Sequence, residues 1–451
     1  MGVLKGLLSG WGRYPVLECV QSRPERFAGL LADTAPRIAR GQGRSYGDAA
    51  LNERGVVLRT ERIDRLLSFD ETKGVLRAEA GVTLAELLKI FVPRGWFPRV
   101  TPGTRFVSLG GCVAADVHGK NHHRDGAFAT SVEALTLLTA DGRRLRCSPK
   151  RQSEAFWATV GGMGLTGVIG EVTLRLMPIE SAYLVAEHQP TRNLGETLAC
   201  LDDDAFDDHY TVAWIDGMAR GEVLGRGVFM RGHHAAVGDL PARLKPNPLA
   251  IPGQAVHSVP FDLPSGWLHP TLLKGFNALY YRRQGGRRTP FVTDYAGFFY
   301  PLDRIGAWNR FYGGRGFVQY QVVVPSEGAE EILATLLGRI VGETGGSPLA
   351  VLKKFGAEGK GLLSFPKPGY TLALDIPLNS EKVMPLLSAL DREVAQCGGR
   401  VYLAKDARLS PESFRAMYPR FGEWYRIKRR LDPDFVFSSA LSRRLRLEEG
   451  P

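Results

Sequence analysis

Short stretches of alternating hydrophobic and polar residues, interrupted by glycines, run through the first part of the chain. Two of them, GVVLRT (55–60) and GVLRAEAG (74–81), are bounded by turn residues, which predicts strands. A helix is predicted to follow at Thr83, because Thr83 and Glu86 have the spacing of a capping box ahead of LLKIF. LTLLTADGRRLRC (135–147) predicts a hairpin that turns at Asp141 and Gly142.

The pattern changes over residues 182–399. Aromatic-rich stretches that predict strands (YTVAWIDG, FVQYQVVVP and YTLALDIP) are separated by helical patterns such as EEILATLLGRIVGE. This arrangement predicts a second domain built on an antiparallel sheet with helices. Within it, residues 241–290 are rich in proline and glycine and have little periodicity, so we expect a long loop or lid there.

Length and composition are compatible with this two-domain organisation. The chain has 451 residues, of which 44% are hydrophobic and 23% charged, as in a soluble globular protein. No apolar run is long enough to cross a membrane, and the N-terminus shows no convincing cleavage site, so a cytoplasmic location is expected. The five cysteines lie far apart without a CxxC pair, which excludes a zinc site of that type and a disulfide framework.

The chain is basic, with 58 Lys and Arg residues against 47 Asp and Glu residues and a formal net charge of +11. This excess favours an anionic partner such as an acidic lipid or a phosphorylated substrate, although a solvated surface explains it as well. No helical pattern combines a basic stripe with interleaved aromatic residues, so nucleic-acid binding is not expected.

Three glycine-rich segments are the main candidates for chemistry: residues 39–52, 101–123 and 158–174. The first is not a Rossmann loop, because a strand pattern follows it rather than a helix. Each segment alone is either a packing turn or a loop whose backbone N–H groups hold a phosphate. Three of them together indicate a long ligand that carries a polyphosphate.

The second segment contains GGCVAADVHGKNHH (110–123), with three histidines. A metal site would need a fourth ligand and a suitable geometry, and no metal is expected here. His122 and His123 are interpreted as structural residues. For His118, which stands between a glycine-rich stretch and Lys120, a role beside a cofactor is the preferred interpretation.

Motifs from the whole chain carry a family resemblance. They are GRSYGDAALN, TPGTR with GGCVAADVHGKNHH, FWATVGGMGLTG, WNRFYGGRGFVQYQ (308–321), LKKFG (352–356), VYLAKDAR (401–408) and MYPRFGEW (417–424). The glycine segments resemble the FAD-binding domain of the vanillyl-alcohol-oxidase superfamily. From about residue 10 to the C-terminus, the chain resembles the decaprenylphosphoryl-β-D-ribose 2′-oxidase family within that superfamily.

The resemblance implies a two-domain α+β flavoprotein. An FAD-binding domain of the PCMH type would span residues 1–181 and an antiparallel-sheet substrate domain residues 182–399. Residues 400–451 would return to the FAD domain. The cofactor-binding positions it implies are Gly41, Gly43, Arg44, Ser45, Tyr46, Gly47, Gly103, Ser108, Leu109, Gly110, Gly111, Ala115, Asp116, Val117, His118, Gly162, Gly167, Ile169, Tyr402 and Lys405.

The resemblance also implies a site for a sugar substrate. Its catalytic residues would be Lys405 and His118, and the choice of general base between them stays open. The substrate-binding positions would be Tyr46, Lys120, Trp214, Gln319, Gln321, Lys353, Thr371 and Ala373. Two of these depart from the mycobacterial pattern, since Ala373 replaces a cysteine and Thr371 an asparagine. These departures leave the exact glycosyl substrate open.

The chemistry implied is oxidation of a secondary hydroxyl by hydride transfer to flavin N5. The implied substrate is a polyprenyl-phosphoryl ribose, oxidised at its 2-hydroxyl as the first step towards the arabinose donor of cell-wall arabinan. A separate NAD(P)-dependent reductase would complete that epimerisation. The alternatives are a soluble alditol or aldonolactone oxidase of the same superfamily and a basic binding protein without enzymatic activity.

Two further expectations concern FAD attachment and the membrane. Some sugar oxidases of the superfamily attach the flavin to a histidine of the first glycine loop; Arg44 occupies that position here and cannot form the bond, so FAD is expected to be non-covalent. The segment 241–290 is expected either to contact a lipid phosphate at a membrane surface or to be a solvated, partly disordered loop. The residues on which this expectation rests are Leu249, Ile251, Val256, Phe261, Trp267, Leu268, Arg282, Arg283, Arg287 and Arg288.

Overall fold

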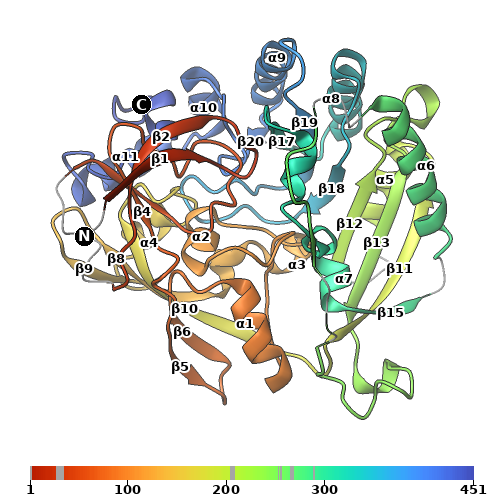
Figure 1. Cartoon of the computed structure of the whole chain (residues 1–451), viewed down its shortest axis with the longest axis horizontal. Coiled ribbons are helices and arrows are strands. Elements are labelled where there is room, and N and C mark those ends of the chain that lie inside the picture. The colour runs from red at the N-terminus through yellow and green to blue at the C-terminus, as the bar shows by residue number, and fades with distance from the viewer. Residues whose placement is uncertain are drawn as a thin grey trace.

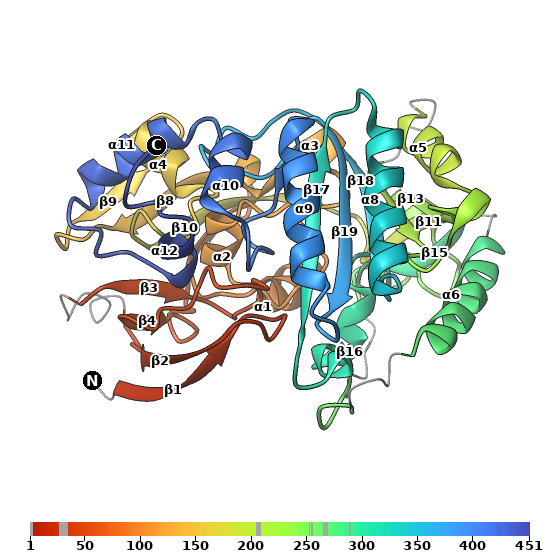
Figure 2. The same ribbon diagram turned by 90° about the horizontal axis from the view of Figure 1, so that it is seen from above.

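The computed structural model describes residues 3–26, 35–203, 209–251, 253, 256–264, 269–287 and 290–451. Two sheets form the N-terminal part (Figures 1 and 2). The first has the order β1-β2-β4-β3, made of Val3–Ser9, Val16–Ser22, Val56–Arg59 and Arg37–Arg40. The second has the order β5-β6-β10-β8-β9, with β7 on β10, made of Leu66–Asp70, Val75–Glu79, Val168–Pro178, Val132–Leu138, Arg144–Cys147 and Trp96–Pro98.

The local predictions for this part are confirmed. The strands predicted over 55–60 and 74–81 are β4 and β6, and the predicted hairpin is β8 with β9. Thr83 caps α1 (Leu84–Phe91) in a complete capping box with Glu86. The other helices of this part are short: α2 (Leu109–Ala114), α3 (His122–Asp125) and α4 (Ser153–Thr159).

A larger sheet of eight strands, antiparallel throughout, makes up the other side of the molecule (Figure 1). Its order is β15-β11-β13-β12-β18-β19-β17-β20, made of Phe291–Asp294, Tyr183–Thr191, Gly227–His234, Tyr210–Ile215, Ala350–Phe355, Gly369–Pro377, Phe317–Val324 and Arg400–Val401. Three helices pack on it and bury their apolar faces there: α5 (Leu194–Asp202), α8 (Ala329–Thr344) and α9 (Val383–Gln396). The antiparallel sheet with helices predicted for this half is therefore present.

The prediction of an irregular loop over 241–290 is wrong in part, because α6 (Pro270–Gly285) forms there with His269 as its N-cap. Apolar and aromatic residues occur on both sides of this helix, so its sequence lacks a clear helical periodicity. Leu272 and Phe276 face solvent, while Tyr280 packs inward. The neighbouring elements are β14 (His257–Ser258), which pairs with β16 (Ile305–Gly306), and α7 (Tyr295–Phe299). Trp267, Leu268 and Arg288 of the expected membrane contact lie outside the described residues.

The C-terminal segment contains α10 (Pro411–Met417), α11 (Phe421–Leu431) and α12 (Ala440–Arg444), which lie beside the N-terminal sheets (Figure 2). Trp424 Nε1 donates to Ala158 O at 3.0 Å, and Lys428 Nζ donates to Leu165 O at 2.6 Å. Both acceptors belong to the third glycine segment, so α11 holds that segment from behind. Short 3₁₀ helices complete the fold at Val92–Arg94, Phe128–Ser131, Gly221–Val223, Val237–Asp239, Pro301–Arg304 and Trp308–Tyr312.

In the part of the chain that the structure describes, no helix is long and apolar enough to cross a membrane. The five cysteines are all free thiols.

Candidate active site

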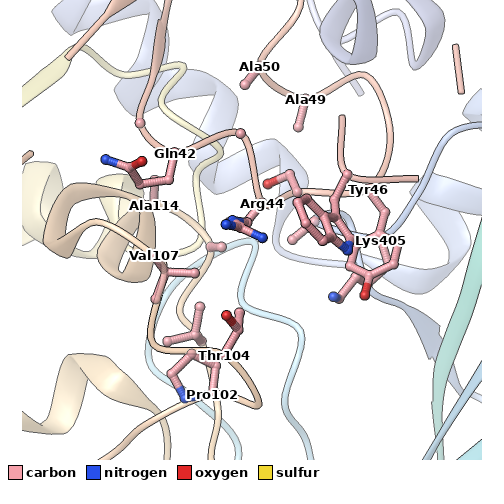
Figure 3. Close-up of a pocket in the computed structure, with 18 of the residues that line it drawn as sticks. Gln42, Arg44, Tyr46, Ala49, Ala50, Pro102, Thr104, Val107, Ala114 and Lys405 are labelled. Carbon is pink, nitrogen blue, oxygen red and sulfur yellow. The ribbon is translucent and has the colours of Figure 1, made fainter. Parts of the chain in front are cut away.

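An extended cavity runs between the three glycine segments on one side and strands β17, β18 and β19 on the other. Tyr46 and Lys405 lie together in one part of it, and Gln42 and Val107 lie in another (Figure 3). The cavity therefore joins segments that are far apart in the sequence: residues 39–50, 102–118, 163–169, 302–321, 349–373 and 402–405.

The glycine segments lie so close to neighbouring chain that side chains would not fit. A Cβ at Gly41 would lie 2.2 Å from Ser108 Oγ, and one at Gly47 would lie 1.7 Å from Asp406 O. The first contact joins the first and second glycine segments along the cavity wall. The second presses the first segment against the turn that carries Lys405, and Tyr46 N donates to Ala404 O there at 2.9 Å.

Most positions predicted to bind the cofactor line this cavity, and four do not. Those that do are Gly41, Gly43, Arg44, Ser45, Tyr46, Gly103, Ser108, Gly110, Gly111, Ala115, Val117, His118, Gly167, Ile169, Tyr402 and Lys405. Gly47, Leu109, Asp116 and Gly162 lie outside the lining, packed behind it. Asp116 is engaged there as an acceptor, from Ser364 Oγ at 2.6 Å and from Ala129 N at 3.2 Å.

The large sheet forms the wall at the far end through its strand register. Gln321 of β17 and Val351 of β18 both pair with Ala373 of β19. Directly paired residues point to the same face of a sheet, so these side chains and that of Lys353, two residues after Val351, face the cavity together. All four line it, as does Gln319.

His118 connects the second glycine segment to this wall. Its Nδ1 lies 3.1 Å from Lys353 Nζ, and its Nε2 lies 3.0 Å from the side-chain amide of Gln321. An ammonium on Lys353 donates to Nδ1, which places the ring proton on Nε2. The Gln321 amide then presents its oxygen to that N–H, an orientation reached by flipping the amide plane.

Burial sets the protonation of this group. It lowers the pKa of His118 well below the ordinary value, and Lys353, His122 and Lys405 lower it further. Burial also lowers the pKa of Lys353 to about 8. His118 is thus a neutral imidazole around neutral pH, while Lys353 keeps most of its positive charge.

Lys405 is the second buried cation at the cavity. Burial lowers its pKa, the charge of Lys353 acts in the same direction, and Asp375 opposes both. Asp375 is fully buried next to Gln319 and accepts hydrogen bonds from Gln319 Nε2 at 2.6 Å and from Tyr312 OH at 3.2 Å. Burial raises the pKa of this carboxyl. The end of the cavity therefore has two lysines and one buried acid.

Three predicted substrate positions do not line the cavity: Lys120, Trp214 and Thr371. Lys120 Nζ donates to Phe298 O and lies 4.3 Å from the centre of the Phe298 ring, and burial lowers its pKa to about 7. Trp214 packs against Tyr280 of α6, with 4.6 Å between the rings. Thr371 is buried beside Gln321, whose amide lies 3.2 Å from its hydroxyl oxygen.

The other two histidines of the second segment have structural partners. Gly356 N donates to His122 Nδ1 at 3.2 Å, and Thr211 Oγ1 lies 3.5 Å from His123 Nδ1. Among the residues that the structure describes, no three His, Cys, Asp or Glu side chains gather into a group that could hold a metal ion.

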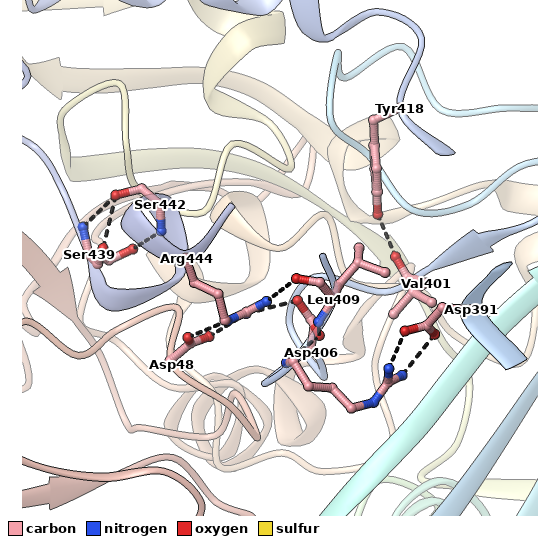
Figure 4. A network of polar contacts seen from close by, with 10 residues as sticks. Asp48, Asp391, Val401, Asp406, Leu409, Tyr418, Ser439, Ser442 and Arg444 are labelled. Carbon is pink, nitrogen blue, oxygen red and sulfur yellow. Dashed lines mark hydrogen bonds and ion pairs between the residues drawn. The ribbon is translucent and has the colours of Figure 1, made fainter. Parts of the chain in front are cut away.

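Arg444 of α12 ties the loops that carry the site residues (Figure 4). Its guanidinium donates to both Asp48 oxygens at 2.8 Å and to Asp406 Oδ2 at 2.9 Å. Asp48 directly follows Gly47 in the first glycine segment, and Asp406 directly follows Lys405. Burial opposes ionisation of Asp406, but Arg444 and Arg408 outweigh it and lower its pKa.

Comparison with known proteins agrees with this geometry. The model of an FAD-binding domain family matches residues 31–148. A decaprenylphosphoryl-β-D-ribose oxidase of Mycolicibacterium smegmatis is 40% identical to this chain over 98% of its length and 97% of the relative. The chain belongs to the decaprenylphosphoryl-β-D-ribose oxidase family.

Other relatives are more distant or match a smaller part. An uncharacterized protein of Streptomyces coelicolor is 38% identical over 81% of this chain and its own full length. An L-gulonolactone oxidase of Bos taurus is 34% identical, but over only 31% of each chain. Membership of the decaprenylphosphoryl-β-D-ribose oxidase family confirms the predicted fold class, an α+β flavoprotein of the vanillyl-alcohol-oxidase type, and makes the chain an FAD-dependent oxidoreductase.

The cavity of this family member fits FAD. Backbone glycines line it where a Cβ would collide with neighbouring chain, as at Gly41, so an extended ligand can approach the main chain closely. Arg44 lies in the cavity with its guanidinium 4.0 Å from the centre of the Trp11 ring. Burial lowers the pKa of Arg44, and Asp303 opposes this shift.

Other residues that line the cavity were not predicted from the sequence. They are Trp11, Ala39, Gln42, Ala49, Ala50, Thr60, Ala80, Pro102, Thr104, Val107, Ala114, Met163, Gly164, Leu302, Asp303, Trp308, Leu349, Val351 and Ala404. Many lie inside the family motifs, and the alternation of side chains along residues 349–353 predicts that Leu349 and Val351 share the face of Lys353. Asp303 has no such signal, because only the fold brings it to the cavity.

Proposed function

We propose that this protein oxidises the 2-hydroxyl of the ribose in a polyprenyl-phosphoryl ribose. The observation that supports it best is the pair of buried lysines, Lys353 and Lys405, at the sheet end of an FAD cavity. Buried ammonium groups are costly unless an anion compensates them. A sugar phosphate provides that anion, and the name of the Mycolicibacterium smegmatis relative describes such a substrate.

FAD, when bound, supplies the acceptor for the hydride of the carbinol C–H bond. The protein has to place the sugar, hold its phosphate and remove the hydroxyl proton. We assign the phosphate to Lys353, whose charge persists to about its pKa of 8. His118 acts through its hydrogen bond to Lys353 Nζ, which holds the ammonium towards the cavity.

The general base is Lys405 in this proposal. An effective base needs a pKa near the working pH. Burial puts the pKa of His118 far too low, and Lys353 already occupies its Nδ1 lone pair. Burial of Lys405 lowers its pKa towards neutrality, so an unprotonated amine is accessible there. The cation that remains after proton uptake would stabilise negative charge at the cofactor.

The domain division expected from the sequence belongs to the same proposal. Residues 1–181 would hold FAD, residues 182–399 the sugar, and residues 400–451 would close the FAD domain. The remaining site residues keep their expected roles. Lys120, Trp214 and Thr371 would act from outside the cavity lining, because they do not line the cavity.

Two partners follow from this chemistry. The ketone product needs a reductase, and we propose a separate NAD(P)-dependent enzyme that restores the hydroxyl with inverted configuration to give the arabinose. A polyprenyl chain resides in a lipid bilayer, so we also propose that the protein works from the cytoplasm in peripheral contact with a membrane.

The test is anaerobic mixing of the FAD-loaded protein with candidate substrates while the flavin absorbance is followed. We expect bleaching by polyprenyl-phosphoryl ribose and none by free ribose, alditols or aldonolactones. Bleaching by an alditol or aldonolactone alone would replace this proposal with a soluble sugar oxidase. Protein purified without flavin that cannot be reconstituted with FAD would instead favour a binding protein.

A further inference from the structure

Helix α6 contacts the protein through polar and aromatic side chains. Asn277, which is 1% exposed, donates from Nδ2 to Asp216 Oδ1 at 2.7 Å. Tyr281 OH donates to Thr191 O at 3.3 Å, and Tyr280 packs on Trp214. These contacts anchor α6 to β11, β12 and the turn that follows β12.

The opposite side of α6 is apolar and faces solvent. Leu272, Phe276 and Leu279 are 61%, 59% and 66% exposed, and their spacing of four and three residues puts them on one face. Val256 and Phe261, earlier in the same segment, are also exposed. A surface helix of a protein that meets only water has the reverse arrangement, so this face is built to contact something apolar.

The surroundings of this face are strongly basic. Between residues 263 and 293 the sequence has five Lys and Arg residues and no Asp or Glu. Of these, Arg282, Arg283 and Arg287 are exposed at the C-terminal end of this face, whereas Lys274 lies on the other side of the helix. We call the three apolar residues and these three arginines the α6 face. Apolar side chains beside a cationic cluster match the acyl chains and negative headgroups of an anionic bilayer.

The α6 face also lies close to the end of the cavity where the sugar is expected. Trp214 pairs with Val351, and Val351 lines the cavity. Paired residues share a sheet face, so Tyr280 covers the same face of the sheet that forms the cavity wall. Figures 1 and 2 place α6 at the edge of the molecule far from the four-stranded N-terminal sheet.

We propose that the α6 face docks the protein on an anionic lipid bilayer, with the apolar side chains inserted between headgroups and the cations on lipid phosphates. This deepens the proposed function, and only the reason for docking rests on that function: a substrate on a lipid anchor would reach the cavity from the bilayer along α6. The docking itself is a property of the surface and can be measured without substrate.

The experiment is vesicle flotation with the full-length, FAD-loaded protein. Vesicles of phosphatidylcholine alone are compared with vesicles that also contain phosphatidylglycerol. We expect binding to the anionic vesicles, weakened by salt. The variant L272S/F276S/L279S should partition at least about tenfold more weakly, because it removes the inserted apolar area. R282Q/R283Q should lose the preference for anionic vesicles.

The matched control is L4S/L7S, which removes two leucines on β1 that are 64% and 73% exposed. It should bind vesicles like the wild type. Equal partition of the triple variant and the wild type would overturn the proposal. A wild-type dimer that dissociates in the triple variant would also overturn the proposal, because the α6 face would then bind a second copy of the chain.

A soluble short-chain polyprenyl-phosphoryl ribose separates docking from catalysis. With this substrate the triple variant and the wild type should bleach their flavin at the same rate, since none of the three residues lines the cavity. Failure of the wild type to bleach would refute the proposed function. The flotation result would still decide docking independently.

Discussion

The ammonium of Lys405 lies 3.7 Å from the centre of the Tyr46 ring, so the first glycine loop and the C-terminal segment meet at one point of the cavity. A cation over an aromatic face is attracted by the ring, and burial strengthens the contact. Tyr46 is itself buried, and burial raises its pKa well above the ordinary value, so it remains a neutral phenol. Lys405 is therefore held in the cavity with its amine available to a ligand.

Replacing Lys405 by methionine should abolish substrate-dependent bleaching and weaken FAD retention, because the variant loses both the base and the cation that it becomes on proton uptake. Anaerobic absorbance traces and the FAD content after gel filtration measure both effects. Lys354→Met is the matched control, since Lys354 of β18 pairs with Asp202 and does not line the cavity. Added ethylamine should partly restore Lys405→Ala if the amine is the base. Full activity of Lys405→Met would remove Lys405 from the site.

We expect His118→Ala to slow substrate-dependent flavin bleaching by roughly 100-fold or more, because Lys353 and Gln321 lose the ring between them and even small misplacement is costly. Single-turnover bleaching at saturating substrate measures this. His257→Ala, at an exposed strand, serves as the control and should leave the rate unchanged. A nearly unaffected rate in His118→Ala would leave His118 with a structural role only.

The pH dependence should show the charge of Lys353. Below its pKa of about 8 the side chain is an ammonium that binds phosphate, and above it that charge is lost. The value of kcat/KM for a phosphorylated substrate should therefore fall as the pH rises above about 8. Bound phosphate raises this pKa, so kcat should lack the same decline. Lys353→Met should have a low kcat/KM without this decline; a wild-type kcat/KM that stays level to pH 10 would contradict the assignment.

Arg444→Met should destabilise the protein by about 3–5 kcal/mol, because two buried carboxylates lose their cation. FAD retention should fall as well, since Asp48 and Asp406 adjoin the first glycine loop and Lys405. Denaturant unfolding of the apo and FAD-loaded forms measures both effects. Its neighbour Arg443 pairs with the half-exposed Glu53, so Arg443→Met should cost only about 0–1 kcal/mol. Equal effects of the two substitutions would contradict a special role for Arg444.

FAD should be released by acid denaturation, because Arg44 occupies the loop position where other sugar oxidases of the superfamily carry the attaching histidine. The guanidinium stacks on Trp11 and has no lone pair for the bond. The test is to precipitate the yellow protein with acid and filter it, with free FAD as the standard for the filtrate. Yellow colour that stays with the precipitate would show a covalent link.

The sequence alone determined the local elements and the family. The capping box at Thr83, strands β4 and β6, and the β8–β9 hairpin depend on neighbouring residues, so their patterns could be read directly. The motifs around the glycine loops and VYLAKDAR indicated the cofactor and the class of chemistry, because backbone contact with a long ligand restricts the residue types at many positions.

The tertiary structure decided which side chains share an environment. Only the fold places Asp375 under Lys405, turns Lys120 towards Phe298 and joins Arg444 to Asp48 and Asp406. It also decides which residues of α6 face inward, because polar and aromatic residues make the contacts with the sheet while three apolar residues stay exposed. The physical reason is the same in each case: burial and charge pairing depend on distances between segments that are remote along the chain, and the free energy of an ionisable or apolar group depends on those surroundings rather than on its sequence neighbours.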